Sequence, residues 1–125
     1  MRQFSDEQIR ELISRGAVFG ASFDAWMLVP DWIRGKTTPK SSGVSLEDVV
    51  KHVDHICQLA GNTRHVGIGT DLDGCFGTEQ TAQDLETIAD LAKLKPLFAA
   101  RGYSEHDIEG ICWRNFVGFL RAAWK

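Results

Sequence analysis

Apolar residues recur every three or four positions in several stretches of the chain, and three of these stretches begin with a helix-capping pattern. Over residues 45–60 the apolar positions hold one helical face for about four turns. Ser45 begins a capping box there, and Gly61 follows the last apolar position. The pattern therefore predicts an amphipathic helix over 45–60. The same capping spacing after Ser5 and Ser104 predicts two more helix starts.

Two short apolar runs between the predicted helices lack helical spacing. Residues 17–23 and 65–70 contain glycine and are too short for a helix, which is typical of buried strands in a parallel sheet. Strands that alternate with helices indicate parallel βα units with right-handed crossovers. Residues 24–43 show no periodicity and are rich in Pro, Gly, Ser and Thr. They predict a long loop, and Trp26 and Trp32 within it favour a binding loop over an inert linker.

The last third of the chain is predicted to be helical. Residues 82–101 are typical of a helix or a turn and helix, with Pro96 as an interruption. A short helix after Ser104 and a final amphipathic helix follow. Helical spacing predicts a core position for the leucine and isoleucine residues of the first stretch and for the aromatic residues near the carboxy terminus: Leu85, Ile88, Leu91, Leu94, Leu97, Trp113, Phe116, Phe119 and Trp124.

The number of predicted strands is too small for a complete α/β domain. Two strands do not form a sheet with both faces covered, and 125 residues is about half the length of a (β/α)8 barrel, which runs to roughly 250 residues. We expect residues 1–125 to form one partial domain of the α/β class. Unpaired parallel strands predict self-association or a missing amino-terminal half.

Charge and cysteine content narrow the possible functions. The chain has 14 Lys and Arg against 17 Asp and Glu, a net charge of −3, which argues against binding to nucleic acid or to an anionic membrane surface. No apolar run is long enough to span a bilayer, and the amino terminus does not resemble a signal peptide. The three cysteines are odd in number and widely spaced. They predict reduced thiols in a cytoplasmic protein.

Asp71 and Asp73 are the strongest candidates for chemistry. They follow directly on the predicted strand 65–70 in a glycine-rich turn, and parallel α/β folds collect functional groups at the carboxyl ends of their strands. Carboxylates placed there can bind a metal, activate water or exchange protons with a substrate. The alternative is a pair of structural turn aspartates, since Asp-Gly pairs are common in turns. A reactive Cys75 beside them is less favoured, because no histidine is placed to activate it.

Other polar residues favour structural roles. His52, Asp54 and His55 could be taken for a metal site, but their positions on the helix 45–60 favour a solvated polar face. His65 precedes its strand and is expected to be structural. No HxD pair after a strand, HExxH motif or paired cysteines occur in the chain, so no zinc motif is present.

Four blocks of sequence resemble the zinc-dependent membrane dipeptidase (renal dipeptidase) family. Residues 66–74, Val-Gly-Ile-Gly-Thr-Asp-Leu-Asp-Gly, look like the family's signature on its eighth strand. Residues 2–9 resemble its block of Arg-Asn before a helix, residues 50–56 its Asp-His-Ile-Asp-His-Ile helix, and residues 101–116 its closing segment. The blocks keep their order and spacing over essentially the whole chain.

The resemblance implies the carboxy-terminal portion of a (β/α)8 TIM-barrel metallohydrolase, with residues 17–23 and 65–70 as its last two strands. Such an enzyme hydrolyses dipeptides at a two-zinc centre, where a bridging hydroxide attacks the peptide carbonyl. By position Asp71 would be the proton-transfer residue, and Arg2 would bind the terminal carboxylate of the dipeptide substrate.

The chain also departs from the family pattern. Gln3 stands where the family usually has asparagine, and the family's zinc ligands would lie before Met1, so that this chain holds none of them. We therefore expect the chain alone to be inactive and to depend on the rest of the barrel. The first alternative is a non-catalytic module that binds peptides through Arg2, Trp26 and Trp32. The second is a remnant without a function of its own.

Overall fold

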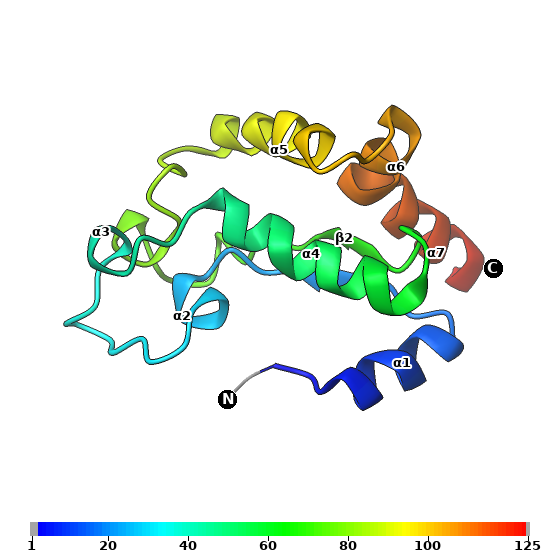
Figure 1. Ribbon diagram of the computed structural model, residues 1–125, viewed down its shortest axis with the longest axis horizontal. Helices are drawn as coiled ribbons and strands as arrows, with labels where there is room; N and C mark the ends of the chain where they lie inside the picture. The colour runs from blue at the N-terminus through cyan, green and yellow to red at the C-terminus, as the bar shows by residue number, and fades with distance from the viewer. Residues whose placement is uncertain (1–2, 125) are drawn as a thin grey trace.

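The computed structural model describes residues 3–124 as two short parallel strands packed among helices (Figure 1). In chain order the elements are α1 (Asp6–Ser14), β1 (Phe19–Ala21), α2 (Ala25–Leu28), α3 (Pro39–Ser42), α4 (Leu46–Ala60), β2 (Val66–Ile68), the 3₁₀ helices η1 (Thr78–Gln80) and η2 (Ile88–Lys93), α5 (Leu94–Ala100), α6 (Glu105–Glu109), the π-helical turn η3 (Gly110–Arg114) and α7 (Asn115–Ala123). None of the helices within residues 3–124 combines the length and the apolar character that crossing a bilayer requires.

The strands β1 and β2 lie side by side in parallel, with Gly20 opposite Gly67. Helix α4 connects them and packs across the sheet in the centre of the molecule (Figure 1). Both strands fall within the predicted segments 17–23 and 65–70, so the βαβ unit is confirmed with shorter strands. The observed class is a helix-rich α/β arrangement around a small parallel sheet.

The core forms around one face of α4. Most of its predicted apolar stripe is buried, together with residues of the loops and of the later helices, while Ile56 and Ala60 are only partly buried. Complete burial of a Val or Leu side chain contributes about 1.5–3 kcal/mol, so this helix makes a large share of the favourable free energy. The largest fully buried side chains are Phe23, Phe98, Leu46, Leu94, Ile111, Val44, Val49, Val50, Val53 and Val66.

Glycines line the opposite face of the sheet, where the two backbones come very close. A Cβ atom built on Gly69 would lie 2.9 Å from the Gly20 Cα, and one on Gly67 would lie 2.3 Å from Phe116 Cδ2. The Phe116 ring of α7 therefore rests directly on backbone. Asn115 holds α7 in this position, because its side-chain amide donates to the carbonyl oxygens of Thr63 and Val66 at 2.7 and 2.8 Å.

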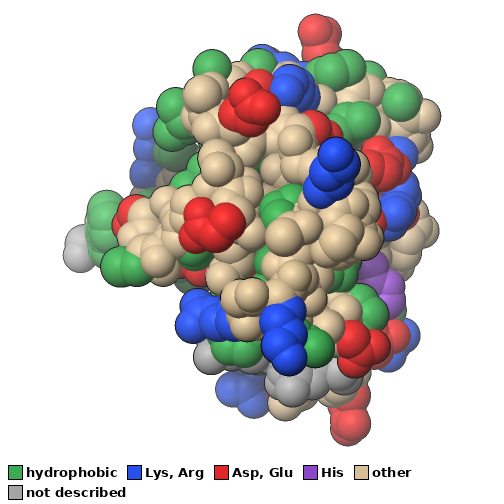
Figure 2. Space-filling model, turned by 90° about the vertical axis from the view of Figure 1, so that its left-hand side faces the viewer, with side chains coloured by type: hydrophobic (Ala, Val, Ile, Leu, Met, Phe, Trp, Pro, Cys, Tyr) green, Lys and Arg blue, Asp and Glu red, His purple; other side chains and the backbone are tan. Residues whose placement is uncertain are grey.

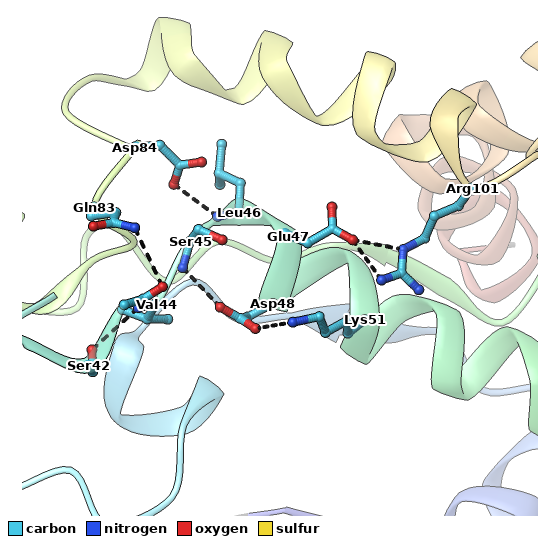
Figure 3. A network of polar contacts seen from close by, with 11 residues as sticks. Ser42, Val44, Ser45, Leu46, Glu47, Asp48, Lys51, Gln83, Asp84 and Arg101 are labelled. Carbon is cyan, nitrogen blue, oxygen red and sulfur yellow. Dashed lines mark hydrogen bonds and ion pairs between the residues drawn. The ribbon is translucent and has the colours of Figure 1, made fainter. Parts of the chain in front are cut away.

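The amino end of α4 is held by polar contacts from its own first turn and from the segment after η1. Figure 3 shows the Asp48 carboxylate accepting from the Ser45 N–H at 3.0 Å and the Asp84 carboxylate accepting from the Leu46 N–H at 2.9 Å. In the same first turn, Glu47 pairs with Arg101, which follows α5, with a nitrogen–oxygen distance of 2.7 Å (Figure 3). A buried helix end needs such partners for its free N–H groups.

The polar side of α4 is more enclosed than the solvated face that we predicted for His52, Asp54 and His55. The Asp54 carboxylate is half-buried and accepts from the Tyr103 hydroxyl at 2.5 Å, with Arg101 at 3.3 Å. The hydrogen bond from Tyr103 lowers the pKa of Asp54, burial opposes this effect, and contacts with Gln58 and Arg101 support it. Arg101 and Tyr103 come from the connection between α5 and α6, far along the chain from Asp54.

Several other predictions need correction. The predicted loop 24–43 contains the short helices α2 and α3. Pro96 does not break the helix α5, because it lies in the first turn of that helix, directly after the 3₁₀ helix η2. Ile88 was predicted to be in the core but is 76% exposed.

The carboxy-terminal aromatic residues were also predicted to be buried, and most of them are not. Trp113 is 53%, Phe119 45% and Trp124 78% exposed, and only Phe116 turns toward the sheet. The helical spacing is present, but no described element packs against the outer side of α7. The apolar stripe of this helix is therefore wider than the surface that covers it.

We predict that Gly67→Ala destabilises the fold, because the new methyl group would displace the Phe116 ring. Overpacking of this kind costs about 1–3 kcal/mol of unfolding free energy, measured by urea denaturation. In a double-mutant cycle with Phe116→Ala, which removes the ring, the two substitutions should show a coupling free energy of at least about 1 kcal/mol. Gly118→Ala is the matched control, since nothing lies within 4 Å of its added Cβ, and it should be neutral or stabilising. Full stability of Gly67→Ala would contradict the close packing.

We predict a pH-dependent effect for Tyr103→Phe. Since the pKa of Asp54 is lowered in the folded protein, its stabilisation is present above the unfolded pKa of about 3.9 and is lost as the pH falls through the lowered value. The substitution should cost about 1–2 kcal/mol at neutral pH and clearly less near pH 3. An equal loss at both pH values, measured by urea denaturation, would assign the effect to packing instead.

Candidate functional site

Both strands end on the same side of the molecule, where the segments that follow them meet. This is the end with α2, α3 and residues 69–87 in Figure 1, and Figure 2 views the molecule from that side. Acidic and basic side chains are interspersed across this face (Figure 2). The described side chains on this face form no basic patch of the kind that nucleic acid would require.

The turn after β2 is strained at two positions. Asp71 and Cys75 have φ angles of 61° and 63°. These values lie in the left-handed region of backbone conformation, which residues other than glycine rarely adopt. The Gly74 N–H donates to the Asp71 carbonyl at 2.9 Å and closes the turn between them. The side chains of Asp71, Asp73 and Cys75 are all exposed. Strained backbone of this kind persists where the surrounding structure enforces it, often at functional sites.

A buried carboxylate fixes the far end of this segment. Asp24, only 4% exposed, accepts from the Trp26 N–H and from the Gln80 side-chain amide, both at 2.9 Å. At the near end the Phe23 N–H donates to the Thr70 carbonyl at 3.0 Å. Residues 71–79, which we call the aspartate loop, are thus attached at both ends to the segment that follows β1. Between these anchors Asp71, Asp73 and Cys75 are exposed, while Leu72 is partly buried against the core.

Sequence reasoning missed Asp24 and Gln80. Asp24 lay in the predicted long loop and Gln80 in a stretch without periodicity, 56 positions away. The one available signal was the helix-cap spacing of Asp24 before Ala25 and Trp26, since Asp commonly caps a helix start. Its pairing with Gln80 is a tertiary contact that no local pattern encodes.

The predicted substrate-binding residue, Arg2, lies outside the described residues. Its neighbour Gln3 is described, and its side-chain amide donates to the Met27 carbonyl in α2. Asp71 and Asp73 occupy the same exposed turn, as the sequence predicted. The roles of Asp71 and Arg2 remain predictions.

Two grooves open beside α2 and α4. The first, about 550 Å³, lies between α2, residues 29–32 and His52, and includes Trp26 and Trp32 in its lining. Trp32 is nonetheless 7% exposed and belongs mainly to the core. Arg34 stacks over the Trp26 ring at 4.7 Å from its centroid. The second groove, about 460 Å³, runs between α1, β1 and α4.

The histidines serve separate contacts. His52 is half-buried in the lining of both grooves, and burial lowers its pKa, partly opposed by a contact with the Leu28 backbone. His55 pairs with Asp6 at 2.8 Å, and His65 contacts the Ala17 carbonyl at 2.9 Å, the structural role that we predicted. Within residues 3–124 no three His, Cys, Asp or Glu side chains group closely enough to hold a metal ion. The described residues therefore do not provide the donor set of a zinc centre.

All three cysteines are free thiols. Burial raises the pKa of the Cys57 thiol to about 11 and also raises the pKa of Cys112. Cys75 in the aspartate loop is exposed. It is therefore the thiol that reagents in solution reach most readily.

Comparison with known proteins identifies the family. The sequence model of the membrane dipeptidases, peptidase family M19, matches residues 1–124. The chain belongs to this dipeptidase family. The resemblance inferred from the four sequence blocks is thereby confirmed, and family membership makes it a relative of hydrolytic metallopeptidases.

Individual relatives support the assignment. The chain is 29% identical over 124 residues to an uncharacterized protein encoded in the pqqA 5′ region of Klebsiella pneumoniae, covering 99% of this chain and 42% of that protein. It is 32% identical over 116 residues to the dipeptidase verJ of Clonostachys rogersoniana, covering 93% of this chain and 26% of that one.

A solved structure shares the fold. A metallopeptidase from Rhodobacter sphaeroides, crystallised with a phosphinate mimic of the dipeptide L-Ala-D-Ala, superposes with a TM-score of 0.80 at 26% identity. The match covers 98% of this chain and 32% of that one. The chain thus spans less than half the length of each of these relatives.

We predict that Asp24 and Gln80 restrain the aspartate loop. A nitroxide attached to the exposed Cys75, in a background where Cys112 is alanine, should gain mobility in its spin-resonance spectrum when Asp24→Ala or Gln80→Leu removes the contact. Asp24→Asn keeps the accepting oxygen and should match the parent protein. Gln83→Ala, which removes only a 3.5 Å surface contact with Gly43, is the control. Equal mobility in all variants would show that the Asp24–Gln80 contact does not hold the loop.

Proposed function

We propose that this chain is the carboxy-terminal part of a (β/α)8 metallohydrolase that cleaves dipeptides, and that it supplies one catalytic carboxylate to an active site completed by the rest of the barrel. Family membership and the 0.80 TM-score to a metallopeptidase support the reaction class. In this proposal β1 and β2 are the seventh and eighth strands of the barrel. The chain alone is inactive.

The observation that carries the proposal is the conformation of Asp71. This residue follows β2 at the carboxyl end of the sheet, where barrel enzymes place their chemistry. Its backbone is held in the left-handed region, in a loop that is anchored at both ends. The left-handed backbone at Asp71 costs conformational free energy. The turn nevertheless holds it, and the Asp71 side chain is exposed rather than packed in the core.

In dipeptide hydrolysis the Asp71 carboxylate would move a proton. The attack of water on the peptide carbonyl releases a proton, and the departing amine nitrogen must gain one before the carbon–nitrogen bond breaks. A carboxylate at the reacting peptide bond can accept the first proton and deliver it to the nitrogen, which is general base and then general acid catalysis. Asp71 is exposed in the isolated chain, so the rest of the barrel would have to exclude water from it.

Zinc, which the family implies, would have to be held by residues of the remaining barrel. The described residues lack the necessary group of ligands, and the proposal assigns no ligand to this chain. A bound zinc would polarise the peptide carbonyl and lower the pKa of a bound water.

For Arg2 we propose recognition of the carboxylate at the end of the dipeptide, since a guanidinium can donate two parallel hydrogen bonds to a carboxylate. The contact of the adjacent Gln3 with Met27 supports a position of this segment beside α2. The proposed location is cytoplasmic, supported by three unpaired cysteine thiols.

The alternative function is a non-catalytic peptide-binding module. The groove beside Trp26 favours it, since its volume of about 550 Å³ falls within the usual range for small-ligand sites. The burial of Trp32 and the stacking of Arg34 on Trp26 leave little free aromatic surface. Binding of dipeptides by the isolated chain, measured by calorimetry and abolished by Trp26→Ala, would favour this alternative.

We predict a loss of turnover when Asp71 becomes asparagine in an assembled enzyme. The test protein is the Rhodobacter sphaeroides metallopeptidase in which this chain replaces the part that it matches. Asn also tolerates the left-handed region, so Asp71→Asn keeps the turn but removes the proton acceptor. We expect kcat to fall about 10²–10⁴-fold, with KM and zinc content nearly unchanged.

The matched control is Asp73→Asn, which removes a carboxylate from the same exposed turn and should change kcat less than about threefold. Equal turnover of Asp71→Asn and the parent chimera would exclude Asp71 from the mechanism. Loss of zinc in Asp71→Asn would instead show that this residue helps to hold the metal.

A further inference from the structure

Helix α2 receives side-chain contacts at both of its ends. Directly before its first residue, the buried Asp24 carboxylate accepts from the Gln80 side-chain amide at 2.9 Å. In its last turn, the Met27 carbonyl accepts from the Gln3 side-chain amide. Gln80 directly follows the aspartate loop, and Gln3 belongs to the segment before α1 that also contains Arg2. Two segments from distant parts of the sequence are therefore attached to one short helix.

Helix α2 is itself held in place by the core. Ala25 is fully buried and Leu28 is 8% exposed. The helix packs against α4, where His52 contacts the Leu28 backbone. The N–H groups of Met27 and Leu28 donate to the Asp24 carbonyl at 2.8 and 3.2 Å. Because Asp24 and Met27 belong to one packed turn, the two attachment points keep a fixed separation of about 4.5 Å along the helix axis.

The two attached segments carry the groups that the proposed function assigns to two different points of the substrate. Asp71 in the aspartate loop would act at the peptide bond, and Arg2 would bind the terminal carboxylate. One residue separates these points in a dipeptide, and two residues separate them in a tripeptide that is cleaved at its first bond. The additional residue lengthens an extended peptide by about 3.3–3.6 Å, which is more than the geometry of a hydrogen bond tolerates.

We propose that α2 is a spacer that limits the assembled enzyme to dipeptides, with Gln3 and Gln80 as positioning residues that hold the two ends of the site at the separation that a dipeptide requires. The inference rests on the proposed function, because it uses the roles proposed for Asp71 and Arg2. Neither glutamine is assigned a contact with the substrate. Each acts through the segment that it attaches to α2.

Substrate length tests the spacer in the chimera of this chain with the Rhodobacter sphaeroides metallopeptidase. The substrates are L-Ala-D-Ala, the dipeptide whose mimic that enzyme binds, and the tripeptide with one more L-Ala. Gln3→Leu releases the segment with Arg2 and should raise KM for the dipeptide about three- to tenfold, with kcat nearly unchanged. Gln80→Leu releases the aspartate loop and should instead lower kcat about three- to tenfold.

The preference for the dipeptide, given as the ratio of the two kcat/KM values, should fall at least about threefold in both variants. Gln83→Leu is the matched control, because it makes the same change at an exposed glutamine whose amide donates to the Gly43 carbonyl at 3.5 Å. It should keep kcat, KM and the preference within about twofold of the parent. A general loss of stability would lower the turnover of both substrates alike and would not separate KM from kcat.

A distance measurement tests the spacer without enzyme activity. Nitroxides are attached to the exposed Cys75 and to Arg2→Cys in the 125-residue chain with Cys112→Ala. Pulsed spin resonance then gives the distribution of distances between the two labels. The distribution should be narrow in the parent chain and in the control variant, and at least about twofold broader in the leucine variants of Gln3 and Gln80.

Each outcome decides the proposal. Unchanged kcat, KM and substrate preference in both variants of an active chimera would overturn the spacer but leave the proposed function standing. A parent chimera that cleaves the tripeptide as efficiently as the dipeptide would overturn the spacer as well. An inactive chimera would count against the proposed function, and the distances alone would then decide whether α2 holds its two segments apart. A distribution as broad in the parent chain as in the variants would overturn the spacer.

Discussion

The packing of α4 across the β1–β2 pair is the contact on which the rest of the molecule depends. Its buried stripe, from Leu46 to Cys57, contributes more residues to the core than any other described element. Its amino end is bound by Asp84, and its polar side by Tyr103 and Arg101. The loops at one end of the sheet and the helices on its flank are thus attached to a single helix, which sets their positions relative to the strands.

The two faces of the β1–β2 sheet pack differently: α4 covers the apolar face, and glycines line the opposite one. Close contact of the Gly20 and Gly69 backbones and of Gly67 with the Phe116 ring leaves no space for side chains. The strands can therefore lie close together at the point where they end, and the segments that follow them meet there. The Asp24–Gln80 contact and the strained Asp71 turn both depend on this convergence.

The elements that the sequence predicted well are those with a strong local signal. The stripe over 45–60 and the capping residues Ser5 and Ser104 determine helix starts without help from distant residues. The placement of Asp71 after a buried strand followed from the same local patterns. Helices α2 and α3 have four residues each, which is too few to show a helical period. The sequence pattern therefore predicts a loop in this region.

The features that escaped prediction depend on contacts between distant segments. Asp24 and Gln80, or Asp54 and Tyr103, are about 50 positions apart in the chain, and their residue types alone do not reveal the pairing. The aromatic residues between positions 113 and 124 have the spacing of a buried stripe, but the spacing does not show whether another element covers that stripe. Trp113 in η3 and Trp124 after α7 are exposed.

The central claim is that the chain contributes a carboxylate to an active site whose metal is held elsewhere. Zinc content of the isolated chain, measured after incubation with excess zinc and gel filtration, tests this claim most directly. The account predicts no retained zinc, because residues 3–124 lack a group of three ligands. About two zinc ions per chain, as in a complete two-metal centre, would contradict it and would make the chain a metalloenzyme in its own right.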